Sequence, residues 1–377
     1  MHRMHFNLEP FLHLGHLFSR GNSDNKEWRH NESHVWFSHG RDALWSLARV
    51  LRARGVRRVL LPAYICDVAV LPFESLEICF YEVDETLSVD PKVIANELRK
   101  GIGLVVIVNY FGFPQPRLSE IQRVCRQQGV PLLLDAAHQL ADTAPVAKDA
   151  NVAACDFVLW CPHKQLPIPD GAVLYCRKDK DRMDIIDQQS PSRPHAKILR
   201  TGARLLYEGM FGPWRSGEQE ASSVSGQPRG GHAGWGTRVR PCGARISPIS
   251  NFLLNRIDIK ETCRRRRDNY QLLATQLRET RLGRPFYETL AGNTCPYLFP
   301  ILLDEKVSIR DAVLDGQLPI YFWPRLSSLV TTLRFPKAEM LARRTLVVAV
   351  HQDLGTDDMA HLNDALRAMT EQAHGSR

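Results

Sequence analysis

Short apolar runs alternate with amphipathic segments along the first half of the chain, and this alternation most constrains the fold. The runs lie at residues 58–61, 78–83, 104–108, 131–134, 156–160 and 172–175. Near-continuous apolar runs of this length are typical of strands that helices cover on both faces. Between them, residues 42–54, 91–100 and 116–128 are predicted helices, and the last two open at proline. We therefore predict an α/β domain with a mostly parallel sheet.

The chain has 377 residues, too many for one ordinary core, and favours a large domain with a smaller one. We predict an N-terminal arm at 1–30, a large domain at 31–248 and a smaller α/β domain at 249–377. Within the large domain, residues 180–210 read as helical, and 212–243, rich in Gly, Ser and Pro, as a long loop. The smaller domain is expected to contain a helix at 249–277, strands at 297–303 and 320–322, and helices at 337–344 and 356–371.

Composition narrows the class of protein. With 44% hydrophobic and 24% charged residues, the chain resembles a soluble globular protein. No apolar run approaches the ~18 residues that span a bilayer, and the first residues lack the apolar stretch of a signal peptide. The nine cysteines form no CxxC pair, so neither a disulfide framework nor a zinc knuckle is indicated. We expect a cytoplasmic protein without a membrane partner.

The net charge of +8 is compatible with nucleic acid, an anionic surface or a phosphorylated small molecule. The densest basic run is 264–267, four arginines with Glu261 and Asp268 close by. No aromatic residues are interleaved there to stack on bases. We therefore interpret the run as a solvated or subunit-contact helix face, and expect no nucleic-acid partner.

Two polar residues follow neighbouring apolar runs in a pattern suited to pyridoxal phosphate. Asp135 ends one predicted strand, and Lys164 comes closely after the strand at 156–160, in a loop with prolines on both sides. Ligands of parallel sheets collect at the carboxyl ends of strands. A lysine there can bond the cofactor aldehyde, and a carboxylate facing the ring nitrogen favours its protonated form. Taken alone, Asp135 is also compatible with binding magnesium, holding a ribose or capping a loop.

Other candidate residues have weaker signals. His138 is suited to pack against the cofactor ring, or to form a metal site with Asp135 and Asp142, although the spacing has no metal signature. A structural histidine is equally consistent. Gly40 and Arg41 open the first strong helix, where backbone amides and a guanidinium can bind phosphate. The nucleotide-binding and hydrolase motifs GxxxxGK[ST], GxGxxG, GxSxG and HExxH are missing.

Taken together, these segments resemble the DegT/DnrJ/EryC1/StrS family of sugar aminotransferases, which use pyridoxal phosphate on the fold type I architecture. The segment 40–44, Gly-Arg-Asp-Ala-Leu, is similar to the phosphate turn G-T-x-A-L. Residues 61–64 match V-P-x-Y/T, 83–90 match V-D-x-D-T-x-x-I-D, and 108–112 match V-H-L-Y-G. The segments 135–138, 160–164 and 245–247 are similar to D-A-A-H/Q, F-H-P-x-K and R-M-S.

The resemblance implies roles for particular residues. Lys164 and Asp135 would be catalytic. The implied cofactor-binding positions are Gly40, Arg41, Asp42, Tyr64, Cys66, His138, Leu159 and Arg245.

Several of these positions depart from the family pattern. Leu159 stands where the family has a phosphate-binding Ser, Cys66 where an aromatic residue stacks on the ring, and Arg41 where a Thr is usual. Gly243 replaces an Asn that reaches the neighbouring subunit. Residues 181–243 match poorly.

The activity that the resemblance implies is transfer of an amino group, with glutamate as the expected donor, to a keto-sugar carried on a nucleotide. A homodimer with shared active sites is expected with it. A different pyridoxal-phosphate reaction on the same fold, such as dehydration, is a second interpretation, although the sugar-dehydrating branch has His at the position of Lys164. A non-catalytic descendant that serves as a scaffold or regulatory module is a third.

Overall fold

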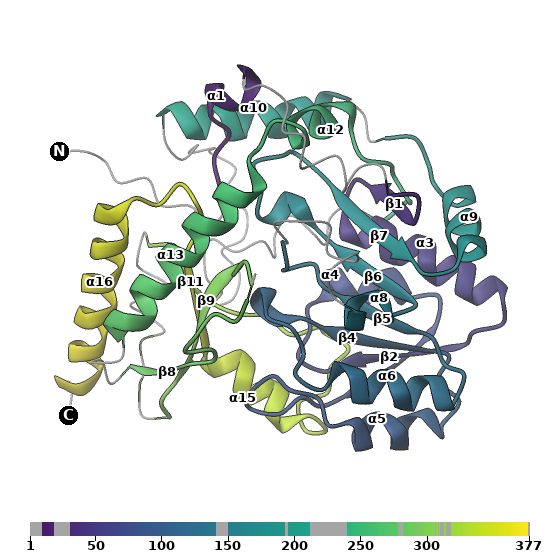
Figure 1. Cartoon of the computed structure of the whole chain (residues 1–377). Coiled ribbons are helices and arrows are strands. Elements are labelled where there is room, and N and C mark those ends of the chain that lie inside the picture. The colour runs from purple at the N-terminus through teal and green to yellow at the C-terminus, as the bar shows by residue number, and fades with distance from the viewer. Residues whose placement is uncertain are drawn as a thin grey trace.

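A computed structural model of the chain describes residues 10–18, 31–140, 150–192, 195–211, 240–277, 282–292, 294–305, 307, 309, 313 and 318–375. Figure 1 shows two sheets, each with helices packed around it. The larger sheet is built from the first half of the chain and the smaller sheet from the last third. The predicted large α/β unit with a smaller C-terminal one is therefore confirmed.

The larger sheet has seven strands in the order β1-β7-β6-β5-β4-β2-β3. All its pairings are parallel except those of β7, which runs antiparallel to β6 and β1. β4, β5 and β6 therefore end at the same edge. The strands are β1 (His34–Phe37), β2 (Arg58–Pro62), β3 (Glu77–Tyr81), β4 (Leu104–Val108), β5 (Leu132–Asp135), β6 (Phe157–Trp160) and β7 (Ala172–Cys176).

Helices cover both faces of this sheet because its strands carry apolar side chains on both sides. On β2, Val59 and Leu61 share a buried cluster with Leu47 of α3, whereas Leu60 shares the opposite cluster with Ile121 of α6. This alternation follows from the two-residue period of a strand. The helical segments of this half are α3 (Gly40–Ala53), α4 (Asp67–Val70), η2 (Leu71–Phe73), α5 (Pro91–Leu98), η3 (Tyr110–Gly112), α6 (Leu118–Gln127), α8 (Ala150–Ala153), η4 (Pro162–Lys164), α9 (Asp179–Asp187) and α10 (His195–Phe211).

The smaller sheet is antiparallel, in the order β10-β11-β9-β8. α13 and α16 lie side by side next to it in Figure 1. Leu134 of the larger sheet and Val347 of the smaller belong to one buried cluster, so a continuous core joins the two units. The elements are α12 (Pro248–Leu254), α13 (Ile259–Leu277), β8 (Gly283–Pro285), β9 (Leu298–Leu303), β10 (Ile320–Phe322), α15 (Pro336–Arg344), β11 (Thr345–Ala349) and α16 (Thr356–Gly375).

The predicted helix at 249–277 is wrong in its continuity. The structure divides it into α12 and α13, with a break between Leu254 and Ile259. Asp258 begins the second helix, because its Oδ1 accepts the backbone N–H of Glu261 at 2.9 Å. A side-chain acceptor three residues before an amide is a typical N-cap interaction. The helical interpretation of 180–210 likewise becomes two helices, α9 and α10, with Pro191 between them.

Three strands were not predicted: β1, β8 and the central strand β11. Most of the predicted loop at 212–243 lies outside the described residues, as does Asp142. Of the predicted N-terminal arm, residues 10–18 are described, with α1 at Leu14–Phe18. Phe11 N donates to Asp353 Oδ2 at 2.7 Å and Leu12 N to Leu205 O at 3.3 Å, so this segment touches both halves of the chain.

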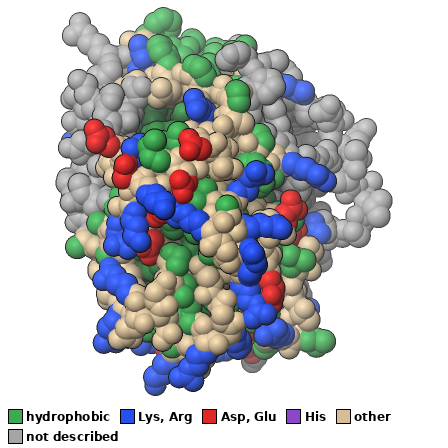
Figure 2. Space-filling model, turned by 90° about the vertical axis from the view of Figure 1, so that its right-hand side faces the viewer, with side chains coloured by type: hydrophobic (Ala, Val, Ile, Leu, Met, Phe, Trp, Pro, Cys, Tyr) green, Lys and Arg blue, Asp and Glu red, His purple; other side chains and the backbone are tan. Residues whose placement is uncertain are grey.

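Basic side chains are widespread on the face shown in Figure 2, which is the side of the molecule where α9 lies in Figure 1. The run at 264–267 is not the uniformly solvated or subunit-contact face that its sequence suggested. Arg264 and Arg265 are exposed and pair with Glu261, but Arg266 is fully buried. A helix turns 100° per residue, so four consecutive arginines must point in different directions.

Across the described part of the chain, no helix combines the length and apolarity needed to cross a membrane. All nine cysteines are described, and none forms a disulfide.

Candidate active site

Asp135 and Lys164 come from adjacent strands and meet at the carboxyl edge of the larger sheet. Asp135 is the last residue of β5 and pairs in register with Leu159 of β6. After β6 the chain makes one turn of helix, η4, which ends at Lys164. Backbone bonds close that turn, because Lys164 N donates to Cys161 O at 3.0 Å and Gln165 N to Pro162 O at 2.9 Å.

The carboxylate of Asp135 is buried and only partly satisfied. Its Oδ1 accepts the N–H of Ala137 at 3.0 Å, and among the described residues no other hydrogen bond or ion pair reaches its side chain. Burial raises the pKa of Asp135, while the nearby charge of Lys164 and the Ala137 amide oppose that rise. The Lys164 amine, half-buried, likewise has no hydrogen-bond partner within the described chain. The Lys164 amine therefore affects the Asp135 carboxylate through its charge, but the two side chains do not form an ion pair.

The N-terminus of α3 lies against the β6 end of this site. A Cβ at Gly40 would lie 2.7 Å from Cys161 Sγ and 3.4 Å from Leu159 Cδ2, so only glycine allows this approach. Leu159 is buried and supplies methyl groups where the family has a hydroxyl. Arg41, half-buried in the first turn, is close enough that its charge opposes the rise in the Cys161 pKa.

Asp42, also in this first turn, is fully buried and holds a different part of the chain. Its Oδ1 accepts the backbone N–H of Cys242 at 2.9 Å, and its Oδ2 lies 3.8 Å from His39 Nδ1. His39, the residue before the helix, meets His163 edge to face at a centroid distance of 5.2 Å. Sequence reasoning missed both histidines, because an isolated histidine carries no spacing signal.

Two thiols lie close to the Lys164 amine. Burial raises the pKa of Cys66, and the charge of Lys164 opposes that rise. The pKa of Cys161 rises to about 12 for the same reason, again opposed by Lys164. Both thiols are therefore protonated at neutral pH, and Cys66 presents a small apolar surface beside the site.

The structure brings the predicted Tyr64 and His138 into contact with the second half of the chain. Tyr64 is fully buried, and its hydroxyl donates to the backbone carbonyl of Trp323. The His138 ring stacks on Tyr297 at 4.8 Å and meets Trp323 edge to face at 5.6 Å. Tyr297 and Trp323 were not found from sequence, because neither lies in a matched motif.

The predicted Arg245 is exposed, and within the described residues its side chain has no ion-pair partner. Its backbone N–H donates to Ser190 O at 3.2 Å, which holds it near β1. Gly243, two residues earlier, has φ of +70°, and a Cβ there would lie 2.7 Å from Gln188 O. No side chain fits at that position, so the family's Asn has no equivalent in this backbone.

The residues present fit pyridoxal phosphate better than a metal. No group of His, Cys, Asp and Glu within the described ranges is arranged to hold a metal ion. An unbonded amine beside a buried, incompletely bonded carboxylate matches the two ends of a cofactor that carries an aldehyde and a basic ring nitrogen. The glycine-lined start of α3 offers amides for the phosphate.

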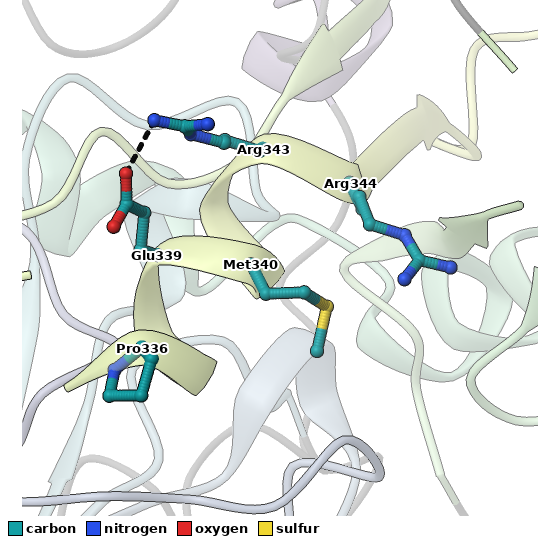
Figure 3. Close-up of a pocket in the computed structure, with 5 residues that line it drawn as sticks. All are labelled: Pro336, Glu339, Met340, Arg343 and Arg344. Carbon is teal, nitrogen blue, oxygen red and sulfur yellow. Dashed lines mark hydrogen bonds and ion pairs between the residues drawn. The ribbon is translucent and has the colours of Figure 1, made fainter. Parts of the chain in front are cut away.

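Surface hollows elsewhere in the molecule do not include these residues. One of about 310 Å³ lies beside α15 and is lined by Pro336, Glu339, Met340, Arg343 and Arg344 (Figure 3). Figure 3 shows Glu339 and Arg343 joined to each other on one turn of the helix, with Arg344 pointing away. Another, of about 620 Å³, follows the edge strand β3. Neither is lined by Lys164 or Asp135.

The fold and the strand-edge site define a class. A mostly parallel seven-stranded sheet with β7 reversed, followed by a smaller α/β unit, is the fold type I architecture of pyridoxal-phosphate-dependent aminotransferases. Residues 30–196 match the model of the DegT/DnrJ/EryC1/StrS aminotransferase family, which confirms the resemblance for the motifs between 40–44 and 160–164, whereas the motif at 245–247 lies outside the match. No curated protein matches the chain in sequence.

Solved structures of aminotransferases align with nearly the whole chain. The aminotransferase TlmJ from Streptoalloteichus hindustanus is 20% identical, with a TM-score of 0.68, and covers 99% of this chain and 100% of its own. Helicobacter pylori PseC, an aminotransferase involved in the biosynthesis of pseudoaminic acid, is 13% identical, with a TM-score of 0.69 and coverage of 98% and 100%. The PLP-form of the putative sugar aminotransferase Spr1654 from Streptococcus pneumoniae is 12% identical, with a TM-score of 0.65 and coverage of 98% and 99%. At these identities the likeness establishes the fold.

Proposed function

We propose that this protein transfers an amino group from an amino acid, with glutamate as the donor, to a keto-sugar carried on a nucleotide, using pyridoxal phosphate. The observation that carries the proposal is the Lys164 amine, to which no group of the described residues is bonded, beside the buried Asp135 carboxylate at the strand edge. Both residues lie inside the segment that matches an aminotransferase family. The match and the chemistry therefore point to the same two side chains.

Each end of the cofactor has a residue suited to it. Lys164 would bond the aldehyde carbon, and after the donor displaces it, its amine is placed to move the proton at the substrate carbon. Burial raises the pKa of the Asp135 carboxylate, and a protonated ring nitrogen facing it would oppose that rise and favour the charged form. When bound, the cofactor supplies the electron sink that this chemistry needs.

The phosphate would be held by backbone amides at the start of α3 and by the Arg41 guanidinium. Leu159 offers no hydroxyl, so a charge-assisted bond from Arg41 is the compensation available there. Cys66 replaces an aromatic ring with a thiol and gives the cofactor less stacking surface. We expect weaker cofactor binding than in relatives that keep the Ser and the aromatic residue.

The finer parts of the proposal have their own support. Six large apolar side chains are exposed on α1, α10 and α12, and such a face suits a second copy of the chain: Leu14, Phe18, Leu199, Tyr207, Met210 and Phe252. Arg245, exposed near β1, is suited to bind a substrate diphosphate. Nine thiols without a disulfide suit a reducing cytoplasm.

Spectroscopy tests the proposal directly. The purified protein with added pyridoxal phosphate should show a visible absorbance band that borohydride abolishes and that Lys164→Ala lacks. A control close in sequence, Lys178→Ala, should keep the band, because that lysine is exposed and follows β7, which runs antiparallel to β6 and ends at the opposite edge of the sheet. A wild-type protein that stays colourless would overturn the catalytic interpretation and favour a non-catalytic scaffold. The apolar Leu159, in place of a phosphate-binding Ser, is consistent with such a scaffold. Loss of the band on adding glutamate in a single turnover would support amino transfer over dehydration.

A further inference from the structure

The arginine run on α13 hides a buried cation that neither the family motifs nor the proposed chemistry accounts for. Arg266 is 0% exposed, whereas its neighbours Arg264 and Arg265 are exposed. Its guanidinium makes four hydrogen bonds: Nε to Gln352 Oε1 at 2.9 Å, one terminal nitrogen to Pro296 O at 3.3 Å and Tyr297 O at 3.1 Å, and the other to Gln165 O at 3.2 Å.

No carboxylate among the described residues touches this guanidinium. Burial lowers the pKa of Arg266, which records the cost of placing a cation there. Such a cost is often avoidable, since apolar residues can replace buried charges without loss of stability. The planar fork of Arg can, however, reach several separate acceptors at once, and neither an apolar side chain nor a Lys can do so.

The acceptors belong to segments on two sides of the candidate site. Gln165 directly follows Lys164, and its carbonyl also accepts Gln352 Nε2 at 3.2 Å. Its side-chain amide in turn donates to His138 O at 3.1 Å. Tyr297, whose carbonyl Arg266 also binds, stacks on the His138 ring at 4.8 Å. One guanidinium therefore ties the Lys164 turn to the segment that packs on His138.

We propose that Arg266 is a positioning residue that holds the Lys164 turn in register with Tyr297 and His138. The effect of Arg266 on catalysis rests on the proposed function, whereas the hydrogen bonds by which it joins the Lys164 turn to Tyr297 do not. The backbone after Lys164 is held by short local bonds, including Leu166 N to Pro162 O at 2.8 Å. Removing the guanidinium leaves the Gln165 carbonyl with only the Gln352 amide as a donor among the described residues, and removes the bond that joins that turn to α13.

Hydrogen exchange on the cofactor-free protein tests the tie. In Arg266→Met, the amides of residues 164, 165, 166 and 168 should exchange about ten-fold faster or more, because the lost charge-assisted bond to the Gln165 carbonyl is worth on the order of 1.4 kcal/mol. Arg267→Met is the matched control: Arg267 is half-buried on the same helix and bonds Thr294 O at 2.8 Å, so its loss should change exchange near Lys164 by less than about two-fold. Unchanged exchange at 164–168 in Arg266→Met would overturn the proposal, as would an equal increase throughout α13 and β9.

Pyridoxal phosphate itself supplies the second measurement. Arg266→Met should bind the cofactor about ten-fold more weakly, and the pH at which its absorbance band changes should shift, since Lys164 is no longer held in one place. Arg266→Lys should recover part of the binding. If the wild type shows no absorbance band, the proposed function is wrong. The hydrogen-exchange result still tests whether Arg266 holds the Lys164 turn in place. Should Arg266→Met not fold, Gln352→Leu is the alternative variant, because it removes one acceptor of Arg266 and one donor to Gln165 O. The proposal then requires the same local increase in the hydrogen-exchange rate near Lys164.

Discussion

Among the buried charges of this protein, those of Asp135 and Arg266 are treated in opposite ways. At the edge of the larger sheet, Asp135 has one backbone donor and a lysine nearby without contact. At the junction of α13 and the smaller sheet, Arg266 has four hydrogen bonds from its guanidinium. A fully bonded buried charge holds structure in place, whereas a partly bonded one has capacity for a ligand. The carboxylate with a single donor therefore marks the site, and the guanidinium bonded at all three nitrogens marks its support.

Gly40→Ala is the strongest test of the sheet-edge region. The new Cβ would lie 2.7 Å from Cys161 Sγ, so we expect a loss of roughly 1–3 kcal/mol in the free energy of unfolding. Denaturant unfolding of the cofactor-free protein measures it. Because the close contact is with the sulfur, Gly40→Ala with Cys161→Ala should restore most of the loss. A single variant as stable as the wild type would mean that the edge is looser than the region around Arg266.

Asp135→Asn should have a smaller effect of opposite sign. Burial raises the folded pKa of Asp135 above 3.8, so its charge opposes folding once pH exceeds that value. The variant should therefore be more stable than wild type by about 1 kcal/mol at pH 7 without cofactor, and the advantage should shrink as pH falls toward 3.8. Thermal unfolding at several pH values measures it. A destabilised variant at pH 7 would contradict the interpretation of Asp135 as incompletely satisfied.

The smallest effect is expected beside the Arg266 junction, where His13 contacts Asp353. Nε2 of His13 lies 3.1 Å from Asp353 Oδ1, and this hydrogen bond raises the pKa of His13 above 6.5. The pair therefore stabilises the protein below that pH and is lost as pH rises through the folded value. Because His13 is exposed, we expect only roughly 0.5 kcal/mol. His13→Gln should abolish this part of the pH dependence of unfolding between pH 6 and 8, and an unchanged profile would show that the contact is inert.

The larger sheet was predictable from sequence, whereas the smaller one was only partly so. Strands such as β4 and β5 are buried on both faces, so their sequences are continuous apolar runs. β11 is equally buried but follows α15 without an intervening loop, so no turn signal separates it from the helix. The break between α12 and α13 depends on one capping residue, Asp258, inside a sequence that otherwise continues a helical pattern.

The site shows the same division. Asp135 could be found because it ends a strand that is visible in the apolar pattern, and Lys164 because it closely follows the next strand, in a segment that resembles a family motif. Tyr297 and Trp323 could not, since they reach His138 only after the smaller sheet packs on the larger.

By itself, the sequence determined the mostly parallel sheet and the edge at which its ligands collect, because both depend on short-range periodicity. Asp135 and Lys164 were singled out at that edge by their spacing together with the family resemblance. The tertiary structure decided which arginine of a basic run is buried and which backbone carbonyls it joins. Those contacts span 101 positions between Arg266 and Gln165. No local pattern encodes such a distance, since it is set by the packing of α13 across the core shared by the two sheets.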